Sequence, residues 1–483
     1  MIRSSLFPIV VAAAVLASCV DDPAQPQNNV KPQLAQVEDG RYILTLNGNT
    51  LDGLTAGVAA LGGTIEFAHL EAGVATVSGL SEATAAKLAT YAGVGDAYRD
   101  IDLQLNTEPE VMDANAEMSE IASPANPTTA VRYSFQWNMR RIQANTAWAI
   151  PGGGGLGSPD VKVAILDSGI DPENLDMAGR IDMVNSRSFV ASDDAFMNTW
   201  LPARPKFDDL NGHGTNVATQ VSSNSIYLAG VNSRTTLLAV KVIGRTGSGS
   251  TSSILNGLIY AADQDADVAN MSLGVPRGFD KAGNGRLLGI INQVFNYAHR
   301  KGMVIVVSAG NDTINMTGAG RIHTAYCESP HVICVAATGP TSSTNAFAGP
   351  WVNEDALAGY SNFGDKLTVA APGGTNRGWV PSVCARRRVT GFLPATPPAQ
   401  PQPVFGCLTA TPNSAVIVGY AGTSQASPHV AGLVAKLVER YGKNNPDAIR
   451  DALINTSVDD LGTAGFDNIY GWGRINVARA LGL

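Results

Sequence analysis

The stretch VKVAILDSG, residues 161 to 169, is a short apolar run that ends in a carboxylate and a glycine. Because it offers apolar side chains to both faces, it is typical of a strand in a parallel sheet covered on both sides. Segments 251–266 and 287–302 have helical length and period. Five further apolar runs alternate with such segments: TLLAVKVI (236–243), ADVANMSL (266–273), MVIVVSA (303–309), VICVAAT (332–338) and LTVAA (367–371). The alternation predicts an α/β fold with a doubly wound, mostly parallel sheet.

Polar residues follow three of these runs directly: Asp167, Ser272 and Asn311. In open α/β sheets, ligands bind at the carboxyl ends of the strands, so these residues are expected near a site. Backbone groups at the end of the strand that closes in MSLG, residues 271–274, are expected to pair with an extended peptide as an added strand. The predicted substrate-binding residues are Ser272, Leu273, Gly274, Ala309 and Gly310.

The stretch GYAGTSQASPHVAG, residues 419 to 432, surrounds Ser424 with small residues. An apolar pattern begins there and continues through Val430, Val434 and Leu437, which predicts that Ser424 stands at the N-terminus of a helix. Unpaired amides and the positive end of the helix dipole would stabilise an oxyanion at that place. The small residues leave a path to the hydroxyl.

A serine hydroxyl becomes a good nucleophile when a base removes its proton and an acid orients that base. Ser424, His213 and Asp167 offer these three roles, and each lies in a setting of small residues: GTSQAS, NGHGTNVA and LDSGI. Asn311, in VVSAGND, is a candidate second donor to the oxyanion through its side-chain amide. Each motif is weak alone, but their combination in one α/β domain favours catalysis.

At these residues the chain resembles the subtilisin-like serine peptidases, through DSG, HGTNVA, SAGN and GTSQASPHVAG. The resemblance covers most of residues 135 to 480. It implies that Asp167 orients the base, His213 acts as general base and then acid, Ser424 is acylated, and Asn311 lies in the oxyanion hole. It also implies that residues 38–105 are an inhibitory propeptide that assists folding and is then removed. Two positions depart from the common family pattern: Gln425 stands where methionine is usual, and Asn216 where histidine is common.

Composition and charge exclude several classes of protein. The chain has 483 residues, 45% of them hydrophobic and 15% charged, so it can bury a full core and is neither disordered nor fibrous. Its net charge of -8 argues against nucleic acid as a partner, because phosphate binding requires a basic surface. Proteins or peptides remain as the expected substrates.

The N-terminus has the layout of an export signal. Arg3 precedes an apolar stretch from Leu6 to Leu16, which is too short to span a bilayer comfortably. LASC, residues 16–19, resembles a bacterial lipobox with Cys19 as the lipidation candidate; cleavage after Ala17 by an ordinary signal peptidase suits the sequence almost as well. We therefore predict a secreted or cell-envelope protein, with any membrane attachment made only through a lipid on Cys19.

The chain divides into five predicted regions. Residues 1–18 are the signal peptide, and residues 19–37, rich in Pro, Gln and Asn, are a flexible tether. Residues 38–105 follow the order β-α-β-β-α-β of a ferredoxin-like α+β domain, whose last strand is expected near 96–105. Residues 106–130 are polar and are predicted to be an exposed linker that contains the maturation site. Residues 131–483 form the catalytic domain, and residues 379–412 are a Pro-rich surface insertion in it.

Four cysteines remain after Cys19. In an exported chain they predict two disulfides, and the near-neighbour pairing of Cys327 with Cys334 and of Cys384 with Cys407 is favoured. Metal ligation is the alternative, but neither pair has the usual CxxC spacing. No cofactor is expected for catalysis. Structural calcium at DDLNG (208–212) or DPENLD (171–176) is an alternative to the favoured interpretation of these segments as solvated loops.

The function expected from these features is that of a secreted serine endopeptidase, made as a self-processing zymogen whose propeptide is an intramolecular inhibitor. A catalytically silent protein that keeps the peptide groove is a second possibility, but the complete set of Asp167, His213, Ser424 and Asn311 argues against it. A serine hydrolase of esters is a third. Its α/β-hydrolase form places the nucleophile in G-x-S-x-G and the acid after it in the chain, unlike this sequence.

Overall fold

The computed structural model describes residues 40–105, 110–275, 278–318, 320–324, 326–394, 400–409, 411 and 413–483. The predicted signal peptide, tether and Cys19 lie outside the described residues. No helix in the described ranges is both long and apolar enough to cross a membrane.

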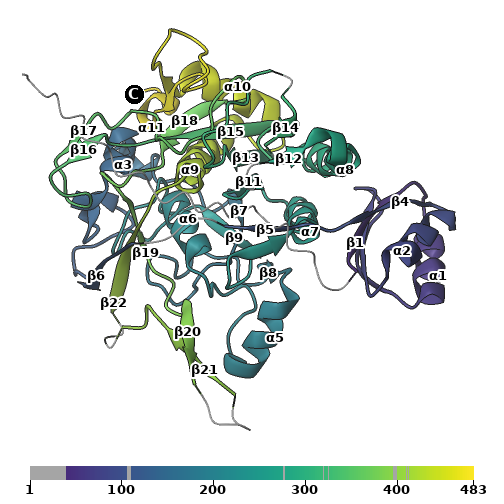
Figure 1. Cartoon of the computed structure of the whole chain (residues 1–483). Coiled ribbons are helices and arrows are strands. Elements are labelled where there is room, and N and C mark those ends of the chain that lie inside the picture. Colours follow the sequence, from purple (N-terminus) through teal and green to yellow (C-terminus); the bar gives the residue numbers. More distant parts are fainter. Residues whose placement is uncertain are drawn as a thin grey trace, which may run out of the picture. The chain divides into compact units, whose positions relative to one another are not determined.

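A nine-stranded sheet forms the centre of residues 131–483, the predicted catalytic region (Figure 1). Neighbouring strands of this sheet are parallel, except for β23 and β24 at one edge, which are antiparallel. The six predicted apolar runs all form strands in it, which confirms the α/β fold. In spatial order the strands are β23 (Val458–Asp459), β24 (Arg474–Ile475), β18 (Val369–Pro372), β15 (Val332–Thr338), β13 (Val304–Ser308), β11 (Val268–Met271), β7 (Lys162–Asp167), β9 (Thr236–Lys241) and β8 (Arg187–Ser188).

Helices cover both faces of this sheet. Strand residues alternate between two cores: Ala164 and Leu166 of β7 pack with α7 (Thr251–Asp263) and α8 (Lys281–Arg300). Val163 and Ile165 of the same strand pack with α6 (His213–Val221) and α9 (Thr423–Tyr441). Each strand is buried on both sides for this reason, as its apolar sequence predicts. Helices α7 and α8 correspond to the predicted helical segments, and α8 begins six residues earlier than expected, at an Asp280 cap.

Residues 42–99 fold around a separate small core. Four antiparallel strands, in the order β2-β3-β1-β4, are joined by two helices in the predicted β-α-β-β-α-β sequence. The elements are β1 (Tyr42–Leu46), α1 (Asp52–Leu61), β2 (Thr64–His69), β3 (Val74–Ser78), α2 (Glu82–Lys87) and β4 (Val94–Arg99).

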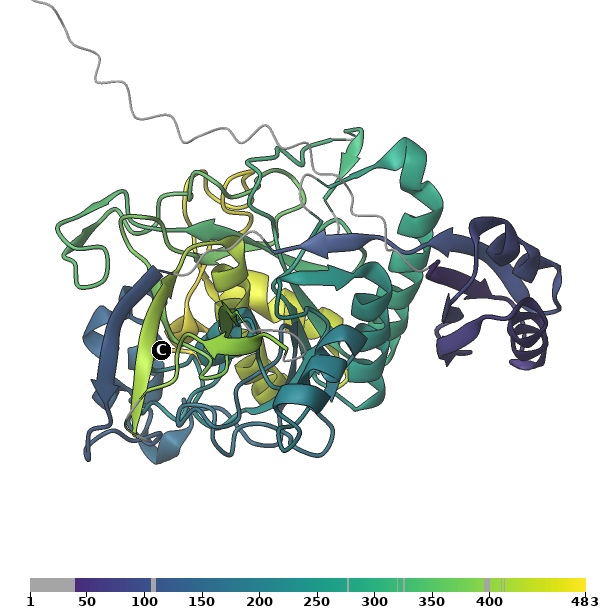
Figure 2. The same ribbon diagram turned by 60° about the horizontal axis from the view of Figure 1, so that its bottom comes forward.

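Two segments differ from the prediction. The expected last strand of the small domain is interrupted after β4, and β5 (Asp102–Gln104) pairs instead with β10 (Ser248–Ser250) of the catalytic region. Part of the predicted linker forms β6 (Glu110–Glu117), which lies beside β22 (Ser414–Tyr420) (Figure 2). Both strands are held by backbone pairing with distant segments, so their own polar side chains give little signal.

The Pro-rich insertion also has more structure than its sequence indicates. It contains the buried strand β19 (Val380–Val383), which pairs with β22, and a hairpin of β20 (Val389–Leu393) and β21 (Gln402–Phe405). A disulfide joins Cys384 to Cys407, with Cα atoms 6.0 Å apart, and a second joins Cys327 to Cys334, with Cα atoms 5.1 Å apart.

The other elements are short or peripheral. They are α3 (Trp137–Arg141), α4 (Ala144–Trp148), α5 (Ala191–Trp200), α10 (Pro446–Thr456), α11 (Val477–Ala480), the ladder of β12 (Phe279–Asp280) with β14 (Ile322–His323), and the ladder of β16 (Ser342–Ser343) with β17 (Trp351–Val352).

A buried lysine in α9 makes stability depend on pH. Lys436 is 1% exposed, its ammonium donates to the Gly155 carbonyl at 2.5 Å, and burial lowers its pKa to about 7. An unfolded lysine titrates near about 10.4, so between these values the unfolded chain binds more protons and stability rises with pH. We expect Lys436→Met to remove this rise, measured by urea unfolding at pH 7 and pH 9. The difference between wild type and variant should change by at most about 1.4 kcal/mol per pH unit. Lys366→Met, at an exposed site, should leave the rise intact.

Candidate active site

Three elements bring Asp167, His213 and Ser424 to one edge of the sheet. Asp167 is the last residue of β7, His213 is the first residue of α6, and Ser424 is the second residue of α9. Because β7, β11 and β13 are parallel neighbours, the residues that follow the latter two, Ser272 and Asn311, reach the same edge.

Asp167 and His213 form a buried pair. Oδ1 of Asp167 lies 2.8 Å from Nδ1 of His213, and the two residues are 1% and 2% exposed. An ionised carboxylate only accepts hydrogen bonds, so Nδ1 carries the proton and Nε2 is left as an acceptor. Nε2 is buried and makes no hydrogen bond with any described residue. Burial lowers the pKa of His213, but the charge and hydrogen bond of Asp167, together with the charge of Asp209, outweigh this effect, and the net pKa is raised.

The hydroxyl of Ser424 makes no hydrogen bond with this acceptor. Its Oγ donates to the Ser272 carbonyl at 3.2 Å, and Ser424 is 5% exposed. Transfer of its proton to His213 therefore requires the hydroxyl to turn from Ser272. Such hydrogen bonds are often long or misaligned before substrate binds. Ser272 is fully buried, and its Oγ donates to the backbone carbonyl of Ser424. This hydrogen bond helps to hold the backbone of Ser424 in place.

Asn311 has a fixed amide orientation. Its Oδ1 accepts from the backbone N–H and the hydroxyl of Thr423, at 2.9 and 2.8 Å. Nδ2 is therefore directed to the other side, where a Cβ atom on Gly422 would lie 3.3 Å from it and 3.7 Å from the Ser424 nitrogen. The Ser424 N–H belongs to the first turn of α9, where amides have no partner within the helix. Two N–H donors thus lie near the nucleophile.

A cleft beside Ser424 contains most of the predicted substrate-binding residues. Leu273 and Gly274 line it together with Ala309, Gly310 and Asn311. Ser272 does not line the cleft. Gln104 and Leu105, from the end of the small domain, line it as well.

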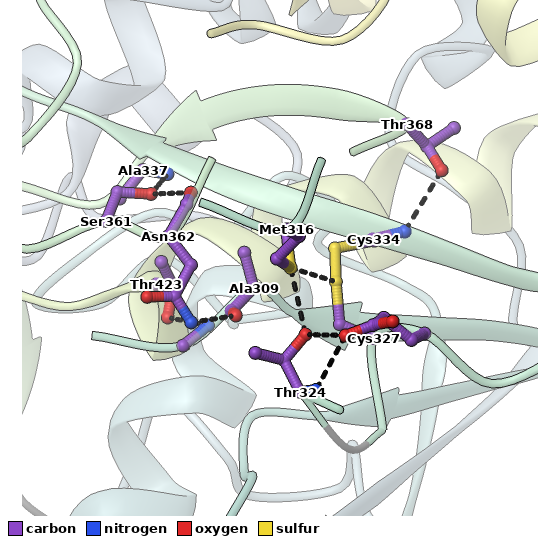
Figure 3. The surroundings of a disulfide bond; sticks show 12 residues. Ala309, Met316, Thr324, Cys327, Cys334, Ala337, Ser361, Asn362, Thr368 and Thr423 are labelled. Atoms are coloured by element: carbon purple, nitrogen blue, oxygen red, sulfur yellow. Dashed lines mark hydrogen bonds between the residues drawn. A yellow bond between two sulfur atoms is a disulfide. The ribbon is translucent and has the colours of Figure 1, made fainter. Parts of the chain in front are cut away.

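Sequence reasoning missed Asn362, which holds the loop that carries Asn311. Its Nδ2 donates to the Ala309 carbonyl at 2.8 Å, and its Oδ1 accepts from the amides of Asp312 and Ile314 at 3.1 and 2.8 Å. Its own N–H donates to the Gly310 carbonyl at 3.0 Å. Figure 3 shows Asn362 directed at Ala309, close to Thr423. No motif in the sequence connects these segments, because the contact exists only in the folded chain.

The Cys327–Cys334 disulfide lies next to this loop (Figure 3). Sδ of Met316 lies 3.8 Å from Sγ of Cys327 and accepts a hydrogen bond from the Thr324 hydroxyl at 3.0 Å. Thr324 lines the cleft, so the disulfide supports one of its walls.

The two residues that depart from the family pattern, Gln425 and Asn216, contact each other. Nε2 of Gln425 donates to Oδ1 of Asn216 at 3.1 Å, and both side chains are fully buried. A glutamine beside the nucleophile is therefore matched by an asparagine that accepts its hydrogen bond.

Comparisons with known proteins identify the family. Residues 158–473 match the model of the subtilase family of peptidases. Thermitase from Thermoactinomyces vulgaris is 31% identical over 352 residues, which cover 72% of this chain and 96% of thermitase. Subtilisin Savinase from Lederbergia lenta is 31% identical over 351 residues, 72% of this chain and 98% of that protein. The chain belongs to the subtilase family. This subtilase is a serine-type endopeptidase.

Solved structures share the fold of this subtilase. The epidermin leader peptide processing serine protease from Staphylococcus aureus covers 92% of this chain and 98% of its own, with a TM-score of 0.64 and 20% identity. Fervidolysin from Fervidobacterium pennivorans, described as a keratinolytic enzyme related to subtilisin, covers 92% of this chain and 61% of its own, with a TM-score of 0.64 and 22% identity.

The candidate calcium segments are occupied by internal hydrogen bonds. Asp209 accepts from the amides of Gly212 and Thr215, and Asp176 accepts from three backbone amides at residues 226–228. Asp208 and Asp171 are paired with Arg204. These carboxylates stabilise the loops around His213. All four carboxylates are fully buried, so the favoured interpretation of these segments as solvated loops is wrong. Calcium binding, the alternative, is not tested by these contacts.

Three potential metal ligands gather elsewhere among the described residues, within 4.8 Å of one another: His299, His331 and Asp447. The two imidazole rings are stacked 3.8 Å apart at 14°. A bound metal lies close to the plane of each imidazole ligand, and the planes of these two stacked rings do not meet within bonding distance of both. As arranged, the cluster does not form a metal site.

Asn362→Ala should reduce kcat about tenfold to a hundredfold, with a smaller change in KM, because the loop that positions Asn311 loses its three side-chain hydrogen bonds. Steady-state kinetics on a peptide substrate measure this split, and thermal unfolding measures stability separately. Asn315→Ala, at an exposed asparagine nearby, is the control. An effect on stability with unchanged kcat would contradict this role.

The raised pKa of His213 predicts an alkaline shift of activity. Neutral imidazole accepts the proton, so kcat/KM rises as pH increases through the pKa, and the midpoint should lie above 6.5. Asp167→Asn removes the largest influence that raises this pKa. The pH profile of the variant's residual activity should therefore have its midpoint at a lower pH than that of wild type. A wild-type midpoint at or below 6.5 would refute the electrostatic account.

Proposed function

We propose that Asp167, His213, Ser424 and Asn311 perform the peptidase reaction of this subtilase. Ser424 Oγ attacks the peptide carbonyl while His213 Nε2 takes its proton, and Asp167 stabilises the imidazolium that forms. The oxyanion accepts hydrogen bonds from Asn311 Nδ2 and the Ser424 N–H. His213 then gives its proton to the leaving nitrogen, the C–N bond breaks, and an acyl-enzyme remains on Ser424. Water then attacks the acyl carbonyl while His213 takes its proton. The C–O bond to Ser424 breaks, the acid is released, and His213 returns the proton to Ser424 Oγ.

The buried, unpartnered Nε2 of His213 is the observation that carries this assignment. A buried acceptor without a hydrogen bond is destabilising by about 1–3 kcal/mol. It is explained here if the missing partner is the Ser424 hydroxyl or the leaving nitrogen of a substrate.

We further propose that residues 38–105 are an intramolecular inhibitor. Three contacts support this: Leu103 of β5 is buried opposite Gly249, the Leu105 N–H donates to the Gly247 carbonyl at 2.8 Å, and Leu105 lines the cleft beside Ser424. A strand in that position occupies the backbone groups that an extended substrate would use.

Contacts away from the cleft support the same proposal. Asp100 accepts from the Ser252 amide at 2.9 Å, at the start of α7, and Gln293 of α8 donates to the Ala72 carbonyl at 2.8 Å. The small domain is therefore held against two helices of the catalytic region, which increases the local concentration of β5 at the cleft.

The subtilase is proposed to be exported and to mature by a cut after Leu105, within residues 106–130. A lipid on Cys19, if attached, would then leave with the propeptide. The active enzyme would be free of the membrane.

Replacement of Ser424 tests both parts of the proposal. Ser424→Ala, expressed in a host that lacks extracellular proteases, should accumulate as uncut proenzyme and should not react with a fluorophosphonate. Wild type should be labelled and should have an N-terminus beyond Leu105, determined by mass spectrometry. Ser427→Ala, in the same helix, is the control and should still mature. Maturation of Ser424→Ala at the wild-type site would show that another protease makes the cut.

A further inference from the structure

The Pro-rich insertion brings three consecutive arginines, Arg386 to Arg388, close to His213. The backbone of Arg388 is held on both sides, since its N–H donates to the Ala385 carbonyl at 3.1 Å and its carbonyl accepts from Gly406 at 2.9 Å. The next amide, that of Val389, donates at 2.9 Å to Leu210, in the loop that leads to His213. The Cys384–Cys407 disulfide closes the base of the hairpin, which lies beside α5 (Figure 1). The position of Arg388 is therefore determined by the fold.

The side chain of Arg388 crosses the residue before the catalytic histidine. A Cβ atom on Gly212 would lie 3.3 Å from Cδ of Arg388 and 3.4 Å from the hydroxyl of Tyr420. Gly212 has a φ of 104°, a conformation that favours glycine, and the missing side chain leaves room for the arginine. The ring of Tyr420 meets the ring of His213 edge-on, with centroids 6.3 Å apart. Arg388, Gly212 and Tyr420 thus form one wall next to His213.

Arg388 differs from its neighbour in its partners. A guanidinium nitrogen of Arg387 lies 3.9 Å from a carboxylate oxygen of Glu173, and its Cζ lies 5.6 Å from the centre of the Phe405 ring. Within the ranges that the structure describes, no carboxylate forms an ion pair with the half-buried Arg388. In a chain with a net charge of -8, a guanidinium beside the active site without a carboxylate is suited to bind one from a substrate.

The wall lies on the leaving-group side of the site. Gln104 and Leu105 line the cleft with Leu273 and Asn311, and the proposed cut after Leu105 makes this the acyl side. Strand β22 runs on the other side, where Gly419 pairs with Glu110, and Tyr420 is its last residue. Residues that come after a scissile bond therefore pass the wall of Arg388, Gly212 and Tyr420.

We propose that Arg388 binds a carboxylate side chain of the substrate and makes this subtilase prefer Asp or Glu among the first three residues after the scissile bond. This inference rests on the proposed catalytic assignment. The chain's own sequence is complementary: residues 106–117, NTEPEVMDANAE, contain four acidic residues and no Lys or Arg. A planar guanidinium suits carboxylates because its fork can donate two parallel hydrogen bonds.

The test compares mature wild type, Arg388→Gln, Arg388→Lys and the matched control Arg387→Gln on internally quenched peptides. The peptides share their acyl side and carry Glu, Gln or Lys at each of the first three leaving-group positions. For wild type, kcat/KM should be about three- to tenfold higher with Glu than with Gln in at least one position, as for a partly exposed ion pair. Arg388→Gln should abolish this ratio, whereas Arg387→Gln and Arg388→Lys should retain most of it.

The ratio separates this inference from the catalytic proposal, because loss of all activity would concern the latter alone. A wild-type ratio near one, an unchanged ratio in Arg388→Gln, or an equal loss in Arg387→Gln would overturn the role of Arg388. If Arg388→Gln does not mature, the salt dependence of the wild-type ratio decides. A ratio that falls toward one at high salt supports an ion pair, and a salt-independent ratio refutes it.

Discussion

The hydrogen bond between Asp167 and His213 is the constraint on which the rest of the site depends. It keeps the proton on Nδ1 and leaves Nε2 as a buried acceptor without a partner among the described residues. The surrounding loop tolerates this arrangement because it is held elsewhere: Asp209 accepts from Gly212 and Thr215, the residues on either side of the start of α6. The imidazole therefore cannot relieve its unsatisfied nitrogen by moving away. A hydroxyl or a leaving amine that reaches this nitrogen would satisfy it.

The side chain of Asn311, the proposed oxyanion donor, is also held by hydrogen bonds within the chain. Asn311 uses its carbonyl oxygen to bind Thr423, and this choice directs its amide N–H groups outward. Asn362 fixes the backbone of the loop that carries Asn311. Because donors are oriented before substrate arrives, little reorganisation is needed when charge develops on the oxygen. Asn311 and its loop are thus fixed in place by hydrogen bonds to Thr423 and Asn362.

The sheet could be predicted from the sequence because each strand is apolar on both faces. Asp167, His213 and Ser424 could be named as candidates because each lies in a glycine-containing motif. Sequence reasoning missed β5 and β6, whose polar residues become strands only by backbone pairing with β10 and β22. It missed Asn362 for a related reason, since its partners lie about fifty residues earlier in the chain. Gln425 and Asn216 were visible as two separate departures, but only the fold shows that they bond to each other. Long-range pairing of polar groups leaves no period in the sequence.

The small domain lines the cleft beside Ser424, whereas the insertion lies beside Gly212, the residue before His213, and the two make different kinds of contact. On the acyl side, β5 pairs with β10 through backbone groups, which accept many sequences and give affinity without much discrimination. On the leaving-group side, the insertion supplies a charged side chain, whose interaction depends on the residues after the scissile bond. In the proposed maturation, a cut between β5 and β6 would leave β5 paired with β10 and β6 paired with β22. Each product would keep its own backbone pairing, so hydrolysis of the connecting bond alone would not empty the cleft, and the proposed inhibition would end only when the small domain leaves.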